Sequence, residues 1–467
     1  MVFSGFPFLF YFLPVFFALY FAMPVKARNA VLLLASLVFY YYGERGYVLL
    51  LVFSSAMDYT ISLFIERLRG TKKAKAALLV SVIGNLLILG FFKYSDFLIM
   101  NINALSGLAI PLFKIHLPLG ISFYTFQTMS YTIDVYRGDA KVQRNPFDFA
   151  AYVTMFPQLV AGPIVRYQTV ADQLSDRRHT WEDFSAGAVR FVIGLGKKVI
   201  IADTLGHLNA TSLAATDKSV LFYWLAVISF MLQIYFDFSG YSDMAIGLGR
   251  IIGFRFLENF NYPFISKSIS EFWQRWHISM GTWFREYIYI PLGGNRVSKL
   301  KWVRNIAVVW FVTGLWHGAA WNFIIWGLFF GAVLALEKLF LMKWLEKIPS
   351  VLRRIYVMVI VIFSFVIFHL ESVEAITEYL KGMVGLGGVP AVNGESLYYL
   401  RSFAFVLVLA VFGATPVLRD LVNKMKQRPK WAAAVDILTP VFAVATLLLA
   451  TAYIVDSSFS PFLYFRF

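Results

Sequence analysis

The sequence predicts an all-α polytopic membrane protein, with about 10 to 12 transmembrane helices and further re-entrant and interfacial helices around a central tunnel. Of its 467 residues, 59% are hydrophobic and 48 are Phe, whereas ordinary soluble domains are roughly 45–50% apolar. Most apolar segments have the length of a helix. A transmembrane β-barrel would instead show alternating segments of about ten residues.

The charge of the chain fits the same class. Its net charge of +15 is explained by basic residues that collect on the cytoplasmic side of a membrane, so nucleic acid is not an expected partner. The absence of cysteine excludes disulfides, thiolate metal sites and a cysteine nucleophile. The first 25 residues contain no Lys or Arg and no small-residue cleavage site. We therefore expect them to form the first membrane helix rather than a cleaved signal peptide.

We expect one membrane domain over residues 1–467. N-terminal spans would occupy residues 1–146, a core with re-entrant segments 147–345, C-terminal spans 346–455 and an extracytoplasmic tail 456–467. Basic connections alternate with connections that are not basic, which places both termini outside. The expected spans of the first and last parts are 6–23, 31–42, 47–64, 78–92, 117–135, 355–368, 403–417 and 433–455.

The predicted core has a less regular pattern. Residues 149–165 are interrupted by Pro and Gly, and irregular backbone at membrane depth requires protein or a water-filled cavity around it. Residues 184–201 carry three basic side chains, so we expect incomplete insertion. Residues 271–295 contain too many charged groups to cross lipid, which indicates amphipathic helices at the membrane interface. The clearer spans are 222–236, 306–315 and 323–336.

His317 stands within the apolar segment V-T-G-L-W-H-G-A-A-W-N-F-I-I-W-G. An ionisable residue inside a membrane usually faces a cavity or the interior of a helix bundle, which makes His317 a candidate site residue. Gly314 and Gly318 lie four residues apart on one helical face, where another helix or a substrate can approach the backbone closely. The alternative is a core histidine that is hydrogen-bonded to a neighbouring carbonyl.

Three other polar residues are candidates. His277 can form an acid/base pair with His317 if folding brings them together, or it can be an interfacial histidine. Asp237 and Asp243 follow an apolar run, which indicates a cavity role, with an ion pair to Arg275 or Arg285 as the alternative. No nucleotide-binding glycine loop or metal-ligand cluster occurs in the sequence.

Tyr464 lies in the terminal sequence P-F-L-Y-F-R-F, on the expected extracytoplasmic side. A phenol is an oxygen nucleophile when a neutral imidazole removes its proton during attack. The alternative is an aromatic anchor at the membrane interface.

Four motifs in combination resemble the membrane-bound O-acyltransferase (MBOAT) family, and in particular its bacterial alginate O-acetyltransferase-like branch. They are W-x-x-W-H-x-S at 273–279, R-E-Y-I-Y-I-P-L-G-G-N-R at 285–296, D-F-S-G-Y-S-D-M-A-I-G at 237–247 and G-L-W-H-G at 314–318. The resemblance implies that His317 is the essential histidine of the family and His277 its second active-site position. The last residues also resemble the terminal motif of a small companion protein in teichoic-acid D-alanylation, which implies that Tyr464 accepts the acyl group.

The resemblance leads us to expect an acyltransferase of a bacterial cytoplasmic membrane, with residues 147–345 as its catalytic core and without a permanently bound cofactor. An acyl group, acetyl by the resemblance, would pass from acetyl-CoA or an acyl carrier protein thioester to an extracytoplasmic polysaccharide. A serine-hydrolase-like acetyltransferase outside the membrane would be its partner. The alternatives are D-alanyl transfer to a cell-wall polymer, a proton-coupled transporter and a structural membrane subunit. Residues expected to line or support the tunnel are Asp237, Asp243, Trp276, Arg285, Trp316 and Asn322.

Overall fold

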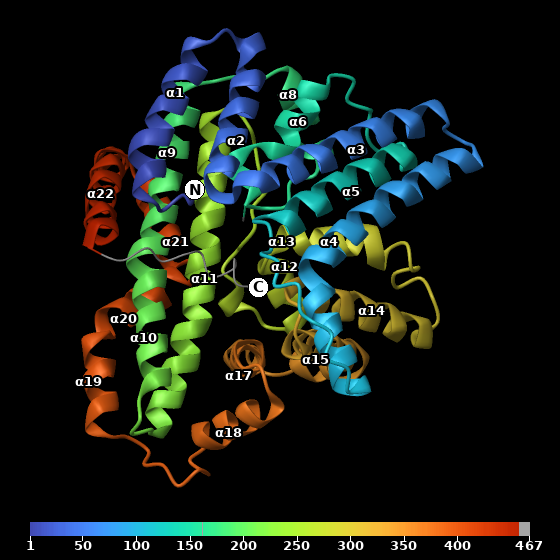
Figure 1. Cartoon of the computed structure of the whole chain (residues 1–467). Coiled ribbons are helices and arrows are strands. Elements are labelled where there is room, and N and C mark those ends of the chain that lie inside the picture. The colour runs from blue at the N-terminus through green and yellow to red at the C-terminus, as the bar shows by residue number, and fades with distance from the viewer. Residues whose placement is uncertain (161, 457–467) are drawn as a thin grey trace. The chain divides into compact units, whose positions relative to one another are not determined.

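A computed structural model describes residues 1–160 and 162–456 (Figure 1). Within these residues every regular element is a helix and no strand occurs. The predicted all-α class is therefore confirmed. Tyr464 and the rest of the expected tail lie outside the described residues.

The structure contains long apolar helices of the kind that the sequence predicts. Among the described residues, six helical runs are long and apolar enough to cross a membrane, or up to seven if a bent pair counts as one span. The expected spans 31–42 and 47–64 fall in one run, Val25–Arg67. Within residues 149–160, where the sequence predicts interrupted backbone, the chain forms parts of two short helices. The other five runs are Lys72–Ser106, Val220–Ile251, Trp321–Leu345, Ser350–His369 and Pro429–Asp456.

The chain forms two compact units. The first consists of Met1–Phe191 and Met244–Leu257, and the second of Val192–Asp243 and the residues from Glu258 onward. The division into spans, core and tail that we expect from the sequence remains a prediction. Helices α9 (Trp181–Gly196) and α11 (Val220–Ile251) have residues in both units.

The first unit is built around α3 (Val48–Arg67), α4 (Lys72–Ser106) and α5 (Ile121–Arg137), which pack against one another; Figure 1 shows α3 and α5 side by side. Asp58 is fully buried between α3 and α4, where it accepts hydrogen bonds from Ser81 Oγ at 2.6 Å and Asn85 Nδ2 at 2.8 Å. A buried carboxylate needs such donors. The other helices of this unit are η1 (Phe8–Phe12), α1 (Leu13–Ala22), η2 (Val25–Ala27), α2 (Arg28–Glu44), η3 (Arg45–Tyr47), α6 (Pro146–Thr154), α7 (Phe156–Leu159) and α8 (Tyr167–Ser175).

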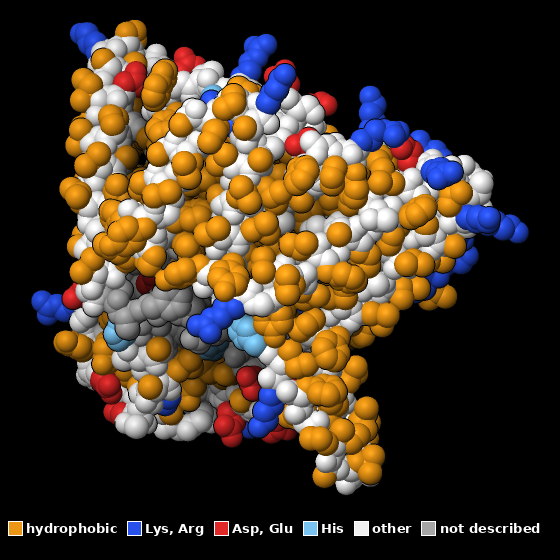
Figure 2. Space-filling view, turned by 45° about the horizontal axis from the view of Figure 1, so that its top comes forward, with side chains coloured by type: hydrophobic (Ala, Val, Ile, Leu, Met, Phe, Trp, Pro, Cys, Tyr) orange, Lys and Arg blue, Asp and Glu red, His pale blue; other side chains and the backbone are white. Residues whose placement is uncertain are grey.

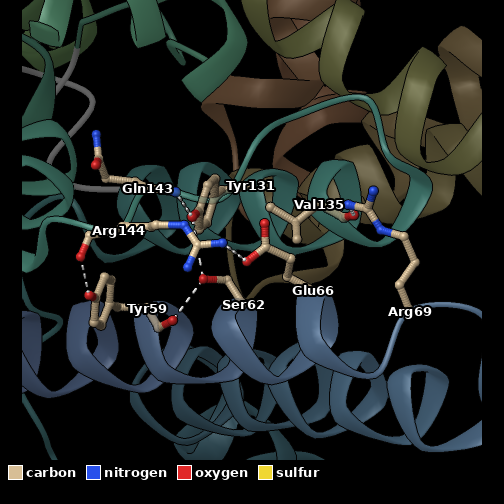
Figure 3. A network of polar contacts seen from close by, with 8 residues as sticks. All are labelled: Tyr59, Ser62, Glu66, Arg69, Tyr131, Val135, Gln143 and Arg144. Atoms are coloured by element: carbon tan, nitrogen blue, oxygen red, sulfur yellow. Dashed lines mark hydrogen bonds and ion pairs between the residues drawn. The ribbon is translucent and has the colours of Figure 1, made fainter.

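A polar network holds α3 to α5 and to the segment before α6 (Figure 3). Tyr131 Oη accepts the backbone N–H of Gln143 at 2.9 Å and the hydroxyl of Ser62 at 3.3 Å. Arg144 donates to Glu66 at 2.9 Å, and its carbonyl accepts from Tyr59 Oη at 2.7 Å. These contacts fix the start of the broken stretch that follows α5.

The outer surfaces of the helices are apolar. Hydrophobic side chains cover much of the face seen in Figure 2, and Lys and Arg side chains gather where α3 and α4 meet. Exposed hydrophobic residues include Leu34, Leu49, Leu87 and Leu105. A surface so rich in exposed apolar side chains suits lipid rather than water.

The second unit contains a core rich in aromatic side chains, from α11, α12, α14, α15 and α17. Phe230, Phe272, Trp310 and Phe330 are buried members of this core. Helices α14 and α15 form a closely packed pair within it. The bounds of its helices are η4 (Lys197–Ala202), α10 (Asp203–Ala214), η5 (Pro263–Ile265), α12 (Ile269–Arg275), α13 (Ile278–Phe284), η6 (Arg285–Tyr289), α14 (Lys299–His317), α15 (Trp321–Leu336), η7 (Glu337–Leu341), α16 (Met342–Leu345), α17 (Ser350–His369), α18 (Val373–Met383), α19 (Gly394–Ser402), α20 (Ala404–Gly413), α21 (Val417–Lys426) and α22 (Pro429–Asp456).

Candidate active site

His277 joins α12 to α13 in a conformation that few side chains adopt. It is the N-cap of α13, with φ +45° and ψ +54°, and its side chain is fully buried. Left-handed backbone at a residue other than glycine costs free energy and persists only where the surroundings enforce it. The burial contrasts with the interfacial position that the sequence left open for this residue.

Asn259 supplies the contacts that hold His277. Its Oδ1 lies 3.1 Å from Nδ1 of His277, and it accepts the backbone N–H of Ser279 at 3.2 Å and the hydroxyl of Ser279 at 2.9 Å. Its Nδ2 donates to Ser242 Oγ at 3.1 Å, and its carbonyl accepts the backbone N–H of Ile278 at 2.9 Å. Asn259 could not be predicted as a site residue, because nothing in its local sequence relates it to His277, 18 positions later.

This network fixes the tautomer of His277. The Asn259 atom that faces a backbone N–H must be the amide oxygen, so Nδ1 of the imidazole must carry the proton that this oxygen accepts. Burial lowers the pKa of His277 to about 3, because desolvation disfavours the imidazolium. The ring is therefore neutral near pH 7. Nδ1 carries the proton, and Nε2 carries the lone pair that can accept a hydrogen bond or a proton.

A second buried group positions the helix that leads to His277. Glu337, fully buried at the start of η7, accepts the backbone N–H groups of Ile269 and Ser270 at 2.7 and 2.8 Å. These N–H groups belong to the first turn of α12, which has no partners for them within the helix. An acidic residue directly after the apolar run of α15 was the available sequence signal for this contact.

His317 is the last residue of α14 and is 4% exposed. Its ring lies against Trp326 of α15, with centroids 4.8 Å apart, and against Phe368 of α17, at 5.5 Å. Asn322 donates through Nδ2 to the carbonyl of Phe368 at 3.1 Å. Helices α14, α15 and α17 thus surround the imidazole with apolar rings.

Glycines allow α14 and α15 to approach closely enough for this arrangement. A Cβ on Gly314 would collide with the carbonyl oxygen of Phe323, and a Cβ on Gly318 would collide with the Phe323 ring. The small face predicted from the sequence therefore receives a helix, α15. Because the two helices are fixed at short range, the position of His317 is determined by backbone contact as well as by side-chain packing.

Trp316 brings the two histidines together. Its ring centroid is 5.8 Å from that of His277 and 5.1 Å from that of His317. Phe238 of α11 contacts the other side of His277 edge-on, at 4.6 Å. Trp276 packs beside this group, stacked on Phe272 at 5.6 Å. His277 and His317 are therefore close to the same indole within the second unit, as an acid/base pair would require.

The alternative in which the two aspartates form ion pairs with Arg275 or Arg285 is wrong. Asp243 pairs with Lys197 at 2.6 Å, and Asp237 pairs with Lys198 at 3.0 Å. Lys198 also pairs with Asp203 at 2.6 Å. Arg275 instead pairs with Glu271 on its own helix, four residues away.

The lysine pairs have a structural reason. A Cβ on Gly240 would lie 2.7 Å from the carbonyl oxygen of Gly194 and 3.1 Å from Cβ of Lys197, so this glycine lets α11 run directly beside the segment that carries both lysines. Buried lysines require carboxylates in return. Arg285 is exposed on η6. The structure thus groups His277, His317, Trp276, Trp316 and Asn322 around the aromatic core, and assigns Asp237 and Asp243 to ion pairs.

Fold and site together define a polytopic α-helical membrane protein with two buried imidazoles beside one indole. No group of three or more His, Asp or Glu side chains among the described residues is arranged to hold a metal ion.

Comparison with known proteins gives the family. Residues 140–377 match the model of the MBOAT, membrane-bound O-acyltransferase family. The chain is 40% identical to a probable alginate O-acetylase AlgI of Azotobacter vinelandii over 100% of both chains. It is 42% identical to a probable alginate O-acetylase AlgI of Pseudomonas aeruginosa, over 93% of this chain and 85% of the relative. It is 34% identical to the peptidoglycan O-acetyltransferase of Helicobacter pylori, over 98% of this chain and 96% of the relative.

The chain therefore belongs to the membrane-bound O-acyltransferase family and is an O-acyltransferase. The resemblance that the motifs indicated is confirmed. Membership in this family also decides against the transporter and the structural subunit that the sequence left as alternatives.

Proposed function

We propose that this enzyme moves an acetyl group from a cytoplasmic thioester, across the membrane, to hydroxyl groups of an extracytoplasmic polysaccharide. The observation that carries the proposal is the packing of His277 and His317 against the same indole, with His277 held in one tautomer by Asn259. Relatives named as alginate and peptidoglycan O-acetylases support acetyl and a polysaccharide. The positive charge of the chain suits either the phosphates of coenzyme A or an acidic carrier protein.

In this proposal His317 is the general base. The acceptor hydroxyl gives its proton to the imidazole while its oxygen attacks the carbonyl carbon of the thioester. The carbon–sulfur bond then breaks, and the departing thiolate takes the proton back from the imidazolium. The products are an ester and a free thiol. The apolar rings around His317 support this role, because they disfavour the imidazolium and keep the base neutral before attack.

His277 has a different role, which follows from its tautomer. Nδ1–H donates to Asn259, so Nε2 can accept a hydrogen bond but cannot donate one. A group of this kind orients a hydroxyl, whereas stabilisation of an oxyanion requires a donor. The network therefore supports orientation of the acceptor hydroxyl by His277.

We further propose that Tyr464 is the first acceptor, on the extracytoplasmic side of a bacterial cytoplasmic membrane. An acetyl ester on its phenol would be passed to sugar hydroxyls by a serine-hydrolase-like partner protein outside the membrane. The sequence P-F-L-Y-F-R-F around Tyr464 supports this step through its resemblance to an acyl-accepting motif.

The test uses purified full-length protein with acetyl-CoA labelled in its acetyl group, followed by peptide mass spectrometry. We expect label on the C-terminal peptide of the wild type and of His207→Gln, a control that changes an exposed histidine. His317→Gln and Tyr464→Phe should lack that label. Label retained in His317→Gln would remove it as the base. Label retained elsewhere in Tyr464→Phe would replace Tyr464 as acceptor and leave the base in place. Label obtained only from an acetylated carrier protein would assign that donor instead.

A further inference from the structure

A cavity of about 760 Å³ lies between α17 and α18, apart from the histidine site. One wall is a single face of α17, because its residues recur at the spacing of a helical stripe. These residues are Val351, Ile355, Met358, Val359 and Ile362. The opposite wall is formed by residues of α18 and of the segment that follows it. They are Thr377, Leu380, Lys381 and Met383 of α18, and Val384 and Leu386 after it. We call this cavity the α17–α18 groove. None of the rings around His317 lines it.

The floor of the groove is held in place and is apolar. Trp224 of α11 lines it, and the indole Nε1–H donates to the carbonyl of Met383 at 3.0 Å. Because the polar atom of Trp224 is already satisfied, the rest of its ring offers only apolar surface. Tyr379 donates to the carbonyl of Tyr223 at 2.6 Å, and a Cβ on Gly382 would collide with the Tyr223 ring. Helix α18 is thus attached to α11 at two points, so the groove is built into the fold.

The charged residues of the groove have one sign. Arg354 and Lys381 line it, and no acidic side chain does so among the described residues. Both cations are exposed. Neither side chain makes a hydrogen bond or ion pair within residues 1–160 and 162–456. Two cations without carboxylate partners beside an apolar groove are complementary to a ligand with an anionic head and a hydrocarbon body.

We propose that the α17–α18 groove binds one anionic phospholipid of the bilayer. An acyl chain lies along the apolar face of α17 and over Trp224, and the phosphate contacts Arg354 and Lys381. The volume of the groove falls within the roughly 300–1,000 Å³ of small-molecule sites. A neutral lipid would fill the apolar part equally well but would leave both cations without an anion. The charge pair therefore gives the groove its selectivity.

The test measures lipid retention by native mass spectrometry of the full chain in detergent. Phosphatidylglycerol and phosphatidylcholine with identical acyl chains are the two probes. We expect the wild type to retain phosphatidylglycerol roughly tenfold more strongly, since each basic residue near the headgroup favours an anionic lipid. Arg354→Gln/Lys381→Gln should lose this preference. The control Arg401→Gln/Lys424→Gln removes the same charge from exposed positions outside the groove and should keep it.

A second pair of measurements locates the chain. Val359 is 59% exposed, so Val359→Trp should fold normally, fill the groove and reduce retention of both lipids. Phosphatidylglycerol with brominated chains should quench part of the tryptophan fluorescence, and Trp224→Phe should remove that part. Equal retention of the two lipids by the wild type would overturn the proposal, as would unchanged preference in Arg354→Gln/Lys381→Gln. These readouts do not depend on acyl transfer.

Discussion

Replacement of Asn259 by Ala tests how the site holds His277. One oxygen of Asn259 serves three donors, and two of these, the imidazole Nδ1–H and the backbone N–H of Ser279, cannot turn to another partner. Each buried donor left unsatisfied costs about 1–3 kcal/mol, so for these two donors we expect Asn259→Ala to destabilise the protein by about 2–6 kcal/mol. The unfolding temperature in detergent measures this loss.

The same variant should lose activity beyond what its lower stability explains. Without Asn259, the proton of His277 is free to move to Nε2, and the left-handed backbone at His277 loses its support. We expect acyl transfer to fall by about 10- to 100-fold at a temperature where the variant is folded, the range seen when the partner that orients an imidazole is removed. The rate should fall in kcat, because the acceptor is bound but badly oriented.

Asn305→Ala is the matched control for Asn259→Ala. Asn305 is fully buried in α14 and donates to the carbonyls of Leu292 and Gly294, each at 3.1 Å, without contact to either imidazole. It should lower the unfolding temperature by a similar amount and leave most of kcat. Equal activity in Asn259→Ala and Asn305→Ala would refute the orienting role of Asn259. If Asn259→Ala were as stable as the wild type, the conclusion that the hydrogen bonds of Asn259 stabilise the protein would be refuted.

Three further predictions concern stability. The pKa of His277 is about 3 in the folded protein and 6.5 ordinarily, so between these pH values only the unfolded chain binds a proton at this residue. The free energy of unfolding should therefore fall by about 1.4 kcal/mol for each pH unit of acidification in this range. Unfolding titrations of His277→Gln should lack this slope. Gly314→Ala should lower the unfolding temperature by overpacking against Phe323, at about 1–3 kcal/mol, while Gly90→Ala, whose new methyl group meets nothing, should not. Lys198→Met removes the ammonium group that pairs with Asp203 and Asp237, and should lower the free energy of unfolding in denaturant by about 3–5 kcal/mol. A variant as stable as the wild type would show that these ion pairs contribute little.

The helical class and the burial of His317 inside the helix bundle could be predicted from the sequence because both are local properties. Apolar segments of helical length indicate membrane helices wherever they pack. Gly314 and Gly318 indicated close helix contact through their spacing alone, and α15 makes that contact. The continuity of the spans 31–42 and 47–64 could not be predicted, since the signs of loop charges do not reveal where a helix continues through a turn such as Arg45–Tyr47.

The partners of polar groups could not be read from the sequence. For Asp237 and Asp243, an ion pair with an arginine was the alternative that the sequence offered, yet both pair with lysines about 40 residues before them in the chain. Asn259 reaches His277 across a loop and α12, which no periodic pattern encodes. The role of Tyr464 rests on sequence resemblance, because this residue lies outside the described part of the chain.

The most direct test of the central claim is the rate of thiol release from acetyl-CoA by the wild type and by His317→Gln, in the presence of an acceptor. The protein contains no cysteine, so a thiol reagent detects only the released coenzyme. A general base contributes about 10²- to 10⁴-fold to such a step. We predict a loss of that size in His317→Gln at an unchanged unfolding temperature. Thiol release within a few-fold of the wild-type rate would contradict the proposal that His317 removes the acceptor proton.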